Sequence, residues 1–119
     1  MARIVIVDDE PDQRFMLRRI LERAGHDVTD ACDGAAALTA VQESSPDLVV
    51  TDMMMPVMGG AELIQRLRGN PATAHIPILA ASGDPGLAGG ADEIVSKPYT
   101  PDQIVVVAEG LLREGRGPS

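Results

Sequence analysis

The sequence predicts an α/β fold in which five parallel strands form one sheet with helices on both faces. Three observations support this fold class. Short β-branched runs alternate with longer segments of helical periodicity, the connections between them are short, and several of the runs are apolar almost throughout, which is typical of strands buried on both faces. With 119 residues and 45% hydrophobic content, the chain suits one compact domain. We expect residues 1–115 to form this domain and residues 116–119 to form a disordered tail.

Five segments rich in β-branched and small apolar residues are expected to form the strands. In chain order they are residues 3–7, 28–32, 48–51, 76–81 and 93–96. Strands that alternate with helices through short connections favour right-handed crossovers and a doubly wound sheet. The common order for five such strands is 2-1-3-4-5, the flavodoxin-like arrangement. Ligands bind this arrangement outside the carboxyl ends of strands 1 and 3, where the direction of winding reverses.

Helix signals lie between these strands and after the last one. Pro11 stands where a first helical turn begins, and Asp33 is placed to cap a second helix. A third helix is expected to end near Gly69. The last helix has the clearest start, because Thr100 and Gln103 are spaced as a capping box.

The connection between the fourth and fifth strands is unusually short. It runs from Gly83 to about Asp92, whereas a complete crossover with its helix needs at least about 10–12 residues. We therefore predict that the helix in this connection, the fourth of the usual fold, is truncated or missing. Its loss would uncover apolar surface, and the last helix is itself unusually apolar. Val105, Val106 or Leu112 is then expected to help form a homodimer or partner interface, unless a loop covers this surface.

Composition excludes several classes of function. The net charge of −8 argues against nucleic-acid binding through a basic surface, and no apolar stretch is long enough to span a membrane. A strand-like run begins within two residues of Met1 and leaves no room for a signal peptide. The single cysteine, Cys32, cannot form an internal disulfide. We therefore expect a cytoplasmic protein that binds neither nucleic acid nor membrane.

Acidic residues follow the two strands that flank the predicted binding edge. Asp8 and Asp9 end the first strand and Asp52 ends the third, so the three carboxylates are expected to converge. Like charges at close range raise each other's pKa unless a cation lies among them. Ligation by carboxylates, waters and phosphate oxygens is what Mg²⁺ prefers. The pattern therefore favours a magnesium site.

Two further groups complete a constellation for phosphoryl transfer. Ser82 ends the fourth strand, and Lys97 follows the fifth; nine of the ten basic residues are arginine, so Lys97 is the single lysine. Taken alone, each of these motifs is as typical of an ordinary turn, helix cap or loop as it is of a functional site. Together, four strand ends would bring a carboxylate nucleophile, a metal site, a hydroxyl and an ammonium to one edge. Asp52, central among them, is the expected phosphate acceptor.

The sequence closely resembles the receiver domains of two-component response regulators over essentially its whole length. Four motifs carry the resemblance: IVIVDDEP at 4–11, LVVTDMMMPVMGG at 48–60, ILAASG at 78–83 and GADEIVSKPY at 90–99. The resemblance implies that the chain is a phosphorylation switch, which accepts a phosphoryl group from a histidine kinase or a phosphotransfer protein and alters a partner-binding surface. It is then not an enzyme in the usual sense, because it catalyses only its own phosphorylation and dephosphorylation.

The resemblance also assigns roles to individual residues. Asp52 is the phosphoacceptor. Asp9 and Asp52, with the main-chain carbonyl of Met54, are implied to bind Mg²⁺, and Asp8 is implied to act through a coordinated water. Ser82 and Lys97 would contact the phosphoryl oxygens.

The chain departs from the family pattern at Ile94, where receivers usually carry an aromatic residue three positions before the lysine. An alternative is therefore a pseudo-receiver, a protein-interaction module that does not switch on phosphorylation. A flavin carrier on this fold would need hydroxyls and backbone donors after the first strand, where the chain has Asp8, Asp9 and Glu10. Hydrolases that form an aspartyl phosphate need a second carboxylate where Met54 stands.

Overall fold

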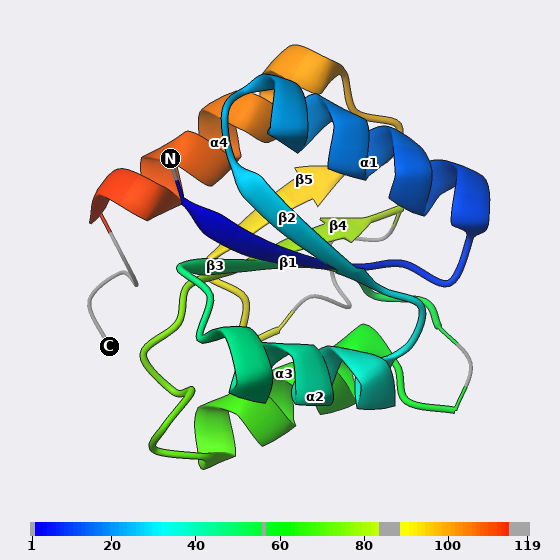
Figure 1. Cartoon of the computed structure of the whole chain (residues 1–119). Coiled ribbons are helices and arrows are strands. Elements are labelled where there is room, and N and C mark those ends of the chain that lie inside the picture. Colours follow the sequence, from blue (N-terminus) through cyan, green and yellow to red (C-terminus); the bar gives the residue numbers. More distant parts are fainter. Residues whose placement is uncertain (1, 56, 84–88, 115–119) are drawn as a thin grey trace.

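A computed structural model describes residues 2–55, 57–83 and 89–114. Five parallel strands form one sheet in the order β2-β1-β3-β4-β5 (Figure 1), which confirms the predicted fold class and strand order. The strands are β1 Arg3–Val7, β2 Asp27–Ala31, β3 Leu48–Asp52, β4 Ile78–Ser82 and β5 Glu93–Ser96. β4 begins two residues later than the sequence indicated, because Pro77 has no N–H to donate to a neighbouring strand.

Four helices cover the two faces of the sheet. They are α1 Pro11–Arg23, α2 Gly34–Ser44, α3 Gly60–Gly69 and α4 Pro101–Glu114. α1 and α4 lie on one face, and α2 and α3 on the other (Figure 1). Each face buries its own hydrophobic cluster, one containing Val5, Val49 and Leu63 and the other Ile6, Val50 and Ile104. The near-continuous apolar character of β1, β3 and β4 follows from this burial on both sides.

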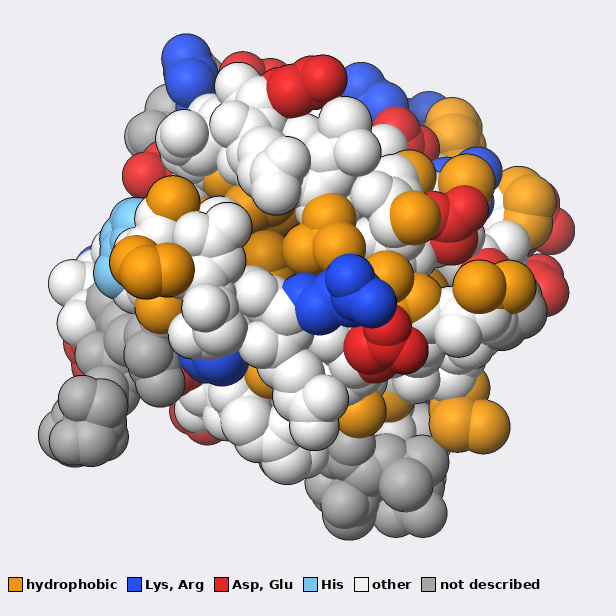
Figure 2. Space-filling view, turned by 90° about the horizontal axis from the view of Figure 1, so that it is seen from below, with side chains coloured by type: hydrophobic (Ala, Val, Ile, Leu, Met, Phe, Trp, Pro, Cys, Tyr) orange, Lys and Arg blue, Asp and Glu red, His pale blue; other side chains and the backbone are white. Residues whose placement is uncertain are grey.

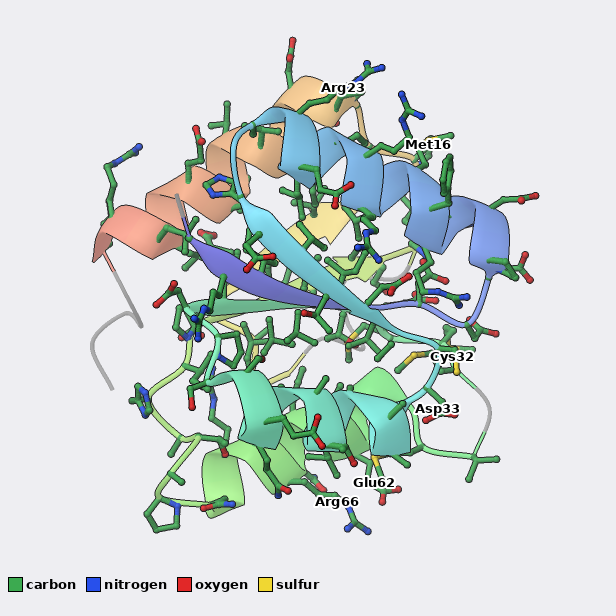
Figure 3. All side chains as sticks on the ribbon, viewed as in Figure 1. Met16, Arg23, Cys32, Asp33, Glu62 and Arg66 are labelled. Carbon is green, nitrogen blue, oxygen red and sulfur yellow. The ribbon has the colours of Figure 1, made fainter. Side chains whose placement is uncertain are left out.

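The helix starts follow the predicted capping chemistry. Asp33, labelled in Figure 3, accepts a hydrogen bond from the Ala36 N–H at 2.7 Å and thereby caps α2. At the start of α4, the Gln103 side chain accepts from the Thr100 N–H at 2.8 Å and the Thr100 hydroxyl accepts from the Gln103 N–H at 3.2 Å. This reciprocal pair is the predicted capping box. No helix within the described ranges has the length and apolarity needed to cross a membrane.

Figure 2 shows the face of the molecule that α2 and α3 cover. Hydrophobic side chains gather in the middle of this face, with basic and acidic side chains beside them. Glu62 and Arg66, labelled in Figure 3, form an ion pair at 2.9 Å one turn apart on α3. Such an exposed pair contributes little to stability, so the packing of α3 rests on its buried Leu63, Ile64 and Leu67.

The connection between β4 and β5 covers only residues 83–92. Gly83 and residues 89–92 form bends, turns or irregular backbone and no helical turn. Residues 84–88 lie outside the described residues, so most of the segment in which we predict a truncated or missing helix is not described. The described residues contain four helices, and the fourth, α4, is the expected last helix, which follows β5. The far end of the connection is anchored by Arg68, whose guanidinium contacts Asp92 at 2.6 Å and the carbonyls of Ile76 and Gly90. The predicted tail, residues 116–119, also lies outside the described residues.

Candidate functional site

The register of the sheet brings the ends of four strands to one edge. Val7 of β1 pairs with Thr51 of β3, and Asp52 pairs with Ala81 of β4. Ser82 pairs with Ser96, the residue before Lys97. Because parallel strands end on the same side, the polar residues that terminate them lie around one depression.

Three carboxylates meet at this edge, as the sequence predicts. Asp8, Asp9 and Asp52 each offer an oxygen, and these three atoms lie within 4.8 Å of one another. Asp8 is 4% exposed and Asp52 is 9% exposed, so two of the three negative charges are held largely away from water. Buried carboxylates at this spacing need a cation or protons to offset their repulsion.

One oxygen of Asp52 is held by two donors. Oδ1 accepts a hydrogen bond from the main-chain N–H of Met53 at 2.8 Å and another from the Lys97 ammonium at 3.1 Å. No hydrogen bond to Oδ2 occurs among the described residues. The carboxylate is therefore fixed in orientation through one of its two oxygens.

The Lys97 ammonium links the carboxylates to helix α1. Besides its contact with Asp52, it donates to the side-chain oxygen of Gln13 at 3.1 Å and lies 4.0 Å from Asp8 Oδ2. Its main-chain N–H donates to the carbonyl of Ser82 at 2.9 Å. Ser82 is itself 1% exposed. The two residues predicted to contact phosphoryl oxygens thus lie on neighbouring strand ends.

Burial raises the pKa of the Asp8 carboxyl above its ordinary value, although the hydrogen bond from the Glu10 N–H at 2.9 Å opposes the shift. The charge of Asp52 raises this pKa further, and Lys97 lowers it. The main chain at Asp8 is fixed by Arg14, which donates to the Asp8 carbonyl at 2.9 Å. Two hydrogen bonds therefore hold the loop that carries Asp8, although burial disfavours the charged form of the Asp8 side chain.

The loop between β3 and α3 depends on a close approach at Gly60. The Gly60 N–H donates to the Met53 carbonyl at 3.0 Å, and a β-carbon added at Gly60 would lie 2.5 Å from the Asp52 carbonyl oxygen. The main chain beyond Asp52 can fold back over the strand end only because residue 60 has no side chain. Met54, whose carbonyl is a predicted metal ligand, is 69% exposed in this loop.

Sequence reasoning did not single out Tyr99, which the structure places near the acidic residues. Burial raises the pKa of its hydroxyl, and the charges of Asp8 and Asp52 raise it further. Its being the single tyrosine of the chain was the one available signal. Because the chain has no tryptophan, Tyr99 is an intrinsic fluorescent probe of this edge of the sheet.

The chain belongs to the receiver domain family of response regulators, whose family model matches residues 4–109. The DNA-binding response regulator MtrA of Mycolicibacterium smegmatis is 41% identical over 93% of this chain and 50% of its own. The alkaline phosphatase synthesis transcriptional regulatory protein PhoP of Bacillus subtilis is 35% identical over 93% of this chain and 48% of its own. This chain thus spans about half the length of these relatives.

Solved structures agree with this membership. The chemotaxis response regulator CheY4 of Vibrio cholerae superposes with a TM-score of 0.87 at 30% identity, over 93% of this chain and 98% of that one. The receiver domain of a signal transduction histidine kinase from Syntrophus aciditrophicus gives a TM-score of 0.89 at 30% identity, over 96% of this chain and 92% of that one. The predicted family and its place in two-component signalling are confirmed.

Removing the charge of Asp8 is expected to stabilise the metal-free protein. Since the pKa of Asp8 is raised on folding, folding disfavours its ionised form, and the destabilisation grows as the pH rises through the folded-state pKa. Asp8→Asn should therefore melt higher than the parent at neutral pH in EDTA. The difference should shrink as the pH falls toward the ordinary aspartate value. Thermal denaturation against pH measures this, with Asp27→Asn, an exposed carboxylate, as the matched control; an equal gain in both variants would contradict the assignment.

Proposed function

We propose that this chain is a phosphorylation-dependent signalling switch whose acceptor is Asp52. The observation that carries the proposal is the state of that carboxylate: Oδ1 accepts hydrogen bonds from Met53 N–H and Lys97, and Oδ2 has no such partner among the described residues. A nucleophile needs one oriented, available oxygen beside groups that offset the charge of the incoming phosphoryl group. Membership of the receiver family supports the same function.

In this proposal Asp52 Oδ2 forms the new bond to phosphorus. The bond from phosphorus to the donor's histidine nitrogen breaks, and that nitrogen keeps the bonding electrons. Lys97, already 3.1 Å from Asp52 Oδ1, stabilises the negative charge of one phosphoryl oxygen, and the Ser82 hydroxyl donates to another. These two donors are charge-offsetting groups of the kind that dominate phosphoryl-transfer catalysis.

The acidic residues fit a magnesium ion. All their ligating atoms are oxygens, they lie within 4.8 Å of one another, and carboxylates are the donors this ion prefers. Asp9, Asp52 and the Met54 carbonyl would hold it directly, and Asp8 would hold it through a water. When bound, the ion neutralises charge shared between the carboxylates and the phosphoryl oxygens.

The donor is proposed to be a histidine kinase or a phosphotransfer protein, and the response is an altered protein-binding surface. The chain would catalyse only its own phosphorylation and dephosphorylation. MtrA is a DNA-binding regulator by name, but this chain covers half of it and carries a net charge of −8, so no direct contact with nucleic acid is proposed. A cytoplasmic location is proposed, where Cys32 would stay reduced.

Incubation with acetyl phosphate and Mg²⁺ tests the function. Intact-mass measurement should show one base-labile phosphoryl adduct per chain, and EDTA should slow its formation by at least about 100-fold, since removing the metal loses several kcal/mol of charge stabilisation. Tyr99 fluorescence should change on Mg²⁺ addition. If no adduct forms under any of these conditions, the chain is instead the alternative, an interaction module that does not switch.

A further inference from the structure

The ammonium group of Lys97 is held from two sides. It donates one hydrogen bond to Asp52 Oδ1 and one to the side-chain oxygen of Gln13, both at 3.1 Å. An ammonium carries three N–H groups, and the third forms no hydrogen bond among the described residues. Asp8 Oδ2, at 4.0 Å, is too distant to accept one. Gln13 therefore provides one of the two hydrogen bonds that hold this cation.

Gln13 belongs to a tripeptide that occurs twice in the chain. Pro-Asp-Gln forms the first three residues of α1 and again of α4. In α4 the glutamine caps its own helix, because the Gln103 side chain accepts from the Thr100 N–H at 2.8 Å. The same use of Gln13 would need the corresponding N–H at the start of α1, which is that of Glu10.

The Glu10 N–H has a different partner. It donates to Asp8 Oδ1 at 2.9 Å, and the Glu10 side chain forms no cap of its own. Asp8 thus binds the N–H that a capping glutamine would bind, and the Gln13 side chain is left to accept from Lys97. The other oxygen of Asp8, Oδ2, is the one that lies 4.0 Å from the ammonium.

The position of this ammonium decides what the acidic cluster of Asp8, Asp9 and Asp52 can bind. Without Gln13, the charge of Asp8 would draw the ammonium from 4.0 Å into hydrogen-bonding distance of Oδ2. The long, flexible side chain of a lysine permits such a movement. The ammonium would then occupy an oxygen of the cluster that fits a magnesium ion, and the two cations would compete for the same carboxylates.

From these contacts we infer that Gln13 is a positioning residue that holds the Lys97 ammonium on the α1 side of the site and so keeps the acidic cluster open to its metal ion. The inference rests on the proposed function, since it gives Gln13 a part in the same phosphoryl transfer. Gln13 acts through Lys97 and touches no reacting atom. Its loss should weaken magnesium binding about tenfold, the lower end of what losing an outer partner of a metal site costs.

Gln13→Leu tests the inference with two measurements that involve no phosphoryl transfer. Because Lys97 is the single lysine, protein made with isotope-labelled lysine gives one set of lysine side-chain signals by NMR, and in EDTA these should shift in Gln13→Leu. The dissociation constant for Mg²⁺, followed by Tyr99 fluorescence, should rise about tenfold.

The rate of adduct formation with acetyl phosphate should divide in the same way. The Mg²⁺ concentration that gives half the maximal rate should rise about tenfold in Gln13→Leu. At saturating Mg²⁺ the rate should approach that of the parent, because the ion then displaces the ammonium from Asp8. Gln13→Leu should also melt with the parent, whereas Gln103→Leu, which loses a helix cap, should melt at a lower temperature.

Two further variants control the experiment. Gln13→Glu keeps an oxygen acceptor of the same reach and should restore magnesium binding to at least the parent affinity. Gln65→Leu, at another exposed helical position and without a hydrogen bond among the described residues, should behave as the parent does. Lysine signals or a magnesium affinity that stay unchanged in Gln13→Leu, or a Gln13→Glu variant that fails to restore the affinity, would each overturn the inference. If the parent forms no adduct, the proposed function fails, while the lysine signals and the magnesium affinity still decide the role of Gln13.

Discussion

Asp52→Asn is expected to abolish formation of the phosphoryl adduct completely. Asparagine has nearly the same shape, and its side-chain oxygen can still accept from the Met53 N–H, which lies 2.8 Å from Asp52 Oδ1 in the parent. It lacks the negative charge that makes the second oxygen a nucleophile. The loss is therefore chemical, and the fold should persist because a charge is removed from a buried site where like charges meet.

A graded series of carboxylate variants makes this expectation specific. Asp9→Asn removes a proposed metal ligand but not the acceptor, so the adduct should still form, at least about tenfold more slowly, the smallest loss typical of weakening a metal site. Asp27→Asn, at the start of β2, should behave as the parent does. Intact mass after acetyl phosphate treatment measures all three. An adduct of undiminished yield in Asp52→Asn would show that another residue is the acceptor.

The arrangement of the site could be predicted because it depends on chain-wide regularities. The strand runs are apolar enough to identify, and parallel strands always end on one side of the sheet. Asp8, Asp52 and Lys97 therefore had to approach one another once the order of strands was known. Their separations in the structure, 3.1 Å for Lys97 to Asp52 and 4.0 Å for Lys97 to Asp8, agree with that expectation.

Other features depend on contacts between residues that no local pattern connects. The Arg68–Asp92 pair, 24 residues apart, anchors the short connection before β5, and the sequence offered no periodic signal for it. The same holds for the hydrogen bond from Lys97 to Gln13, across 84 residues. The exposure of Phe15 and Met16 on α1 was also not predicted, because apolar residues at helical spacing usually indicate a side that faces the core.

Gly60→Ala is expected to destabilise the protein and impair the acceptor. The added methyl group would lie 2.5 Å from the Asp52 carbonyl oxygen and 2.8 Å from the Met53 α-carbon, both main-chain atoms that cannot turn aside. Overpacking of this kind costs about 1–3 kcal/mol, which lowers the melting temperature by roughly 10 °C in a domain of this size. The displaced strand end carries Asp52, so phosphorylation by acetyl phosphate should slow as well.

Gly69→Ala provides the comparison within the same helix. A β-carbon at Gly69 would meet nothing within 4 Å, and alanine at a helical position is favoured over glycine by about 0.5–1 kcal/mol. Thermal denaturation of both variants, with the rate of adduct formation, separates the effects. Gly69→Ala should melt at or above the parent temperature with an unchanged rate. If Gly60→Ala also melted at the parent temperature with an unchanged rate, residue 60 would have space for a side chain, and the proposed close approach at Gly60 would be wrong.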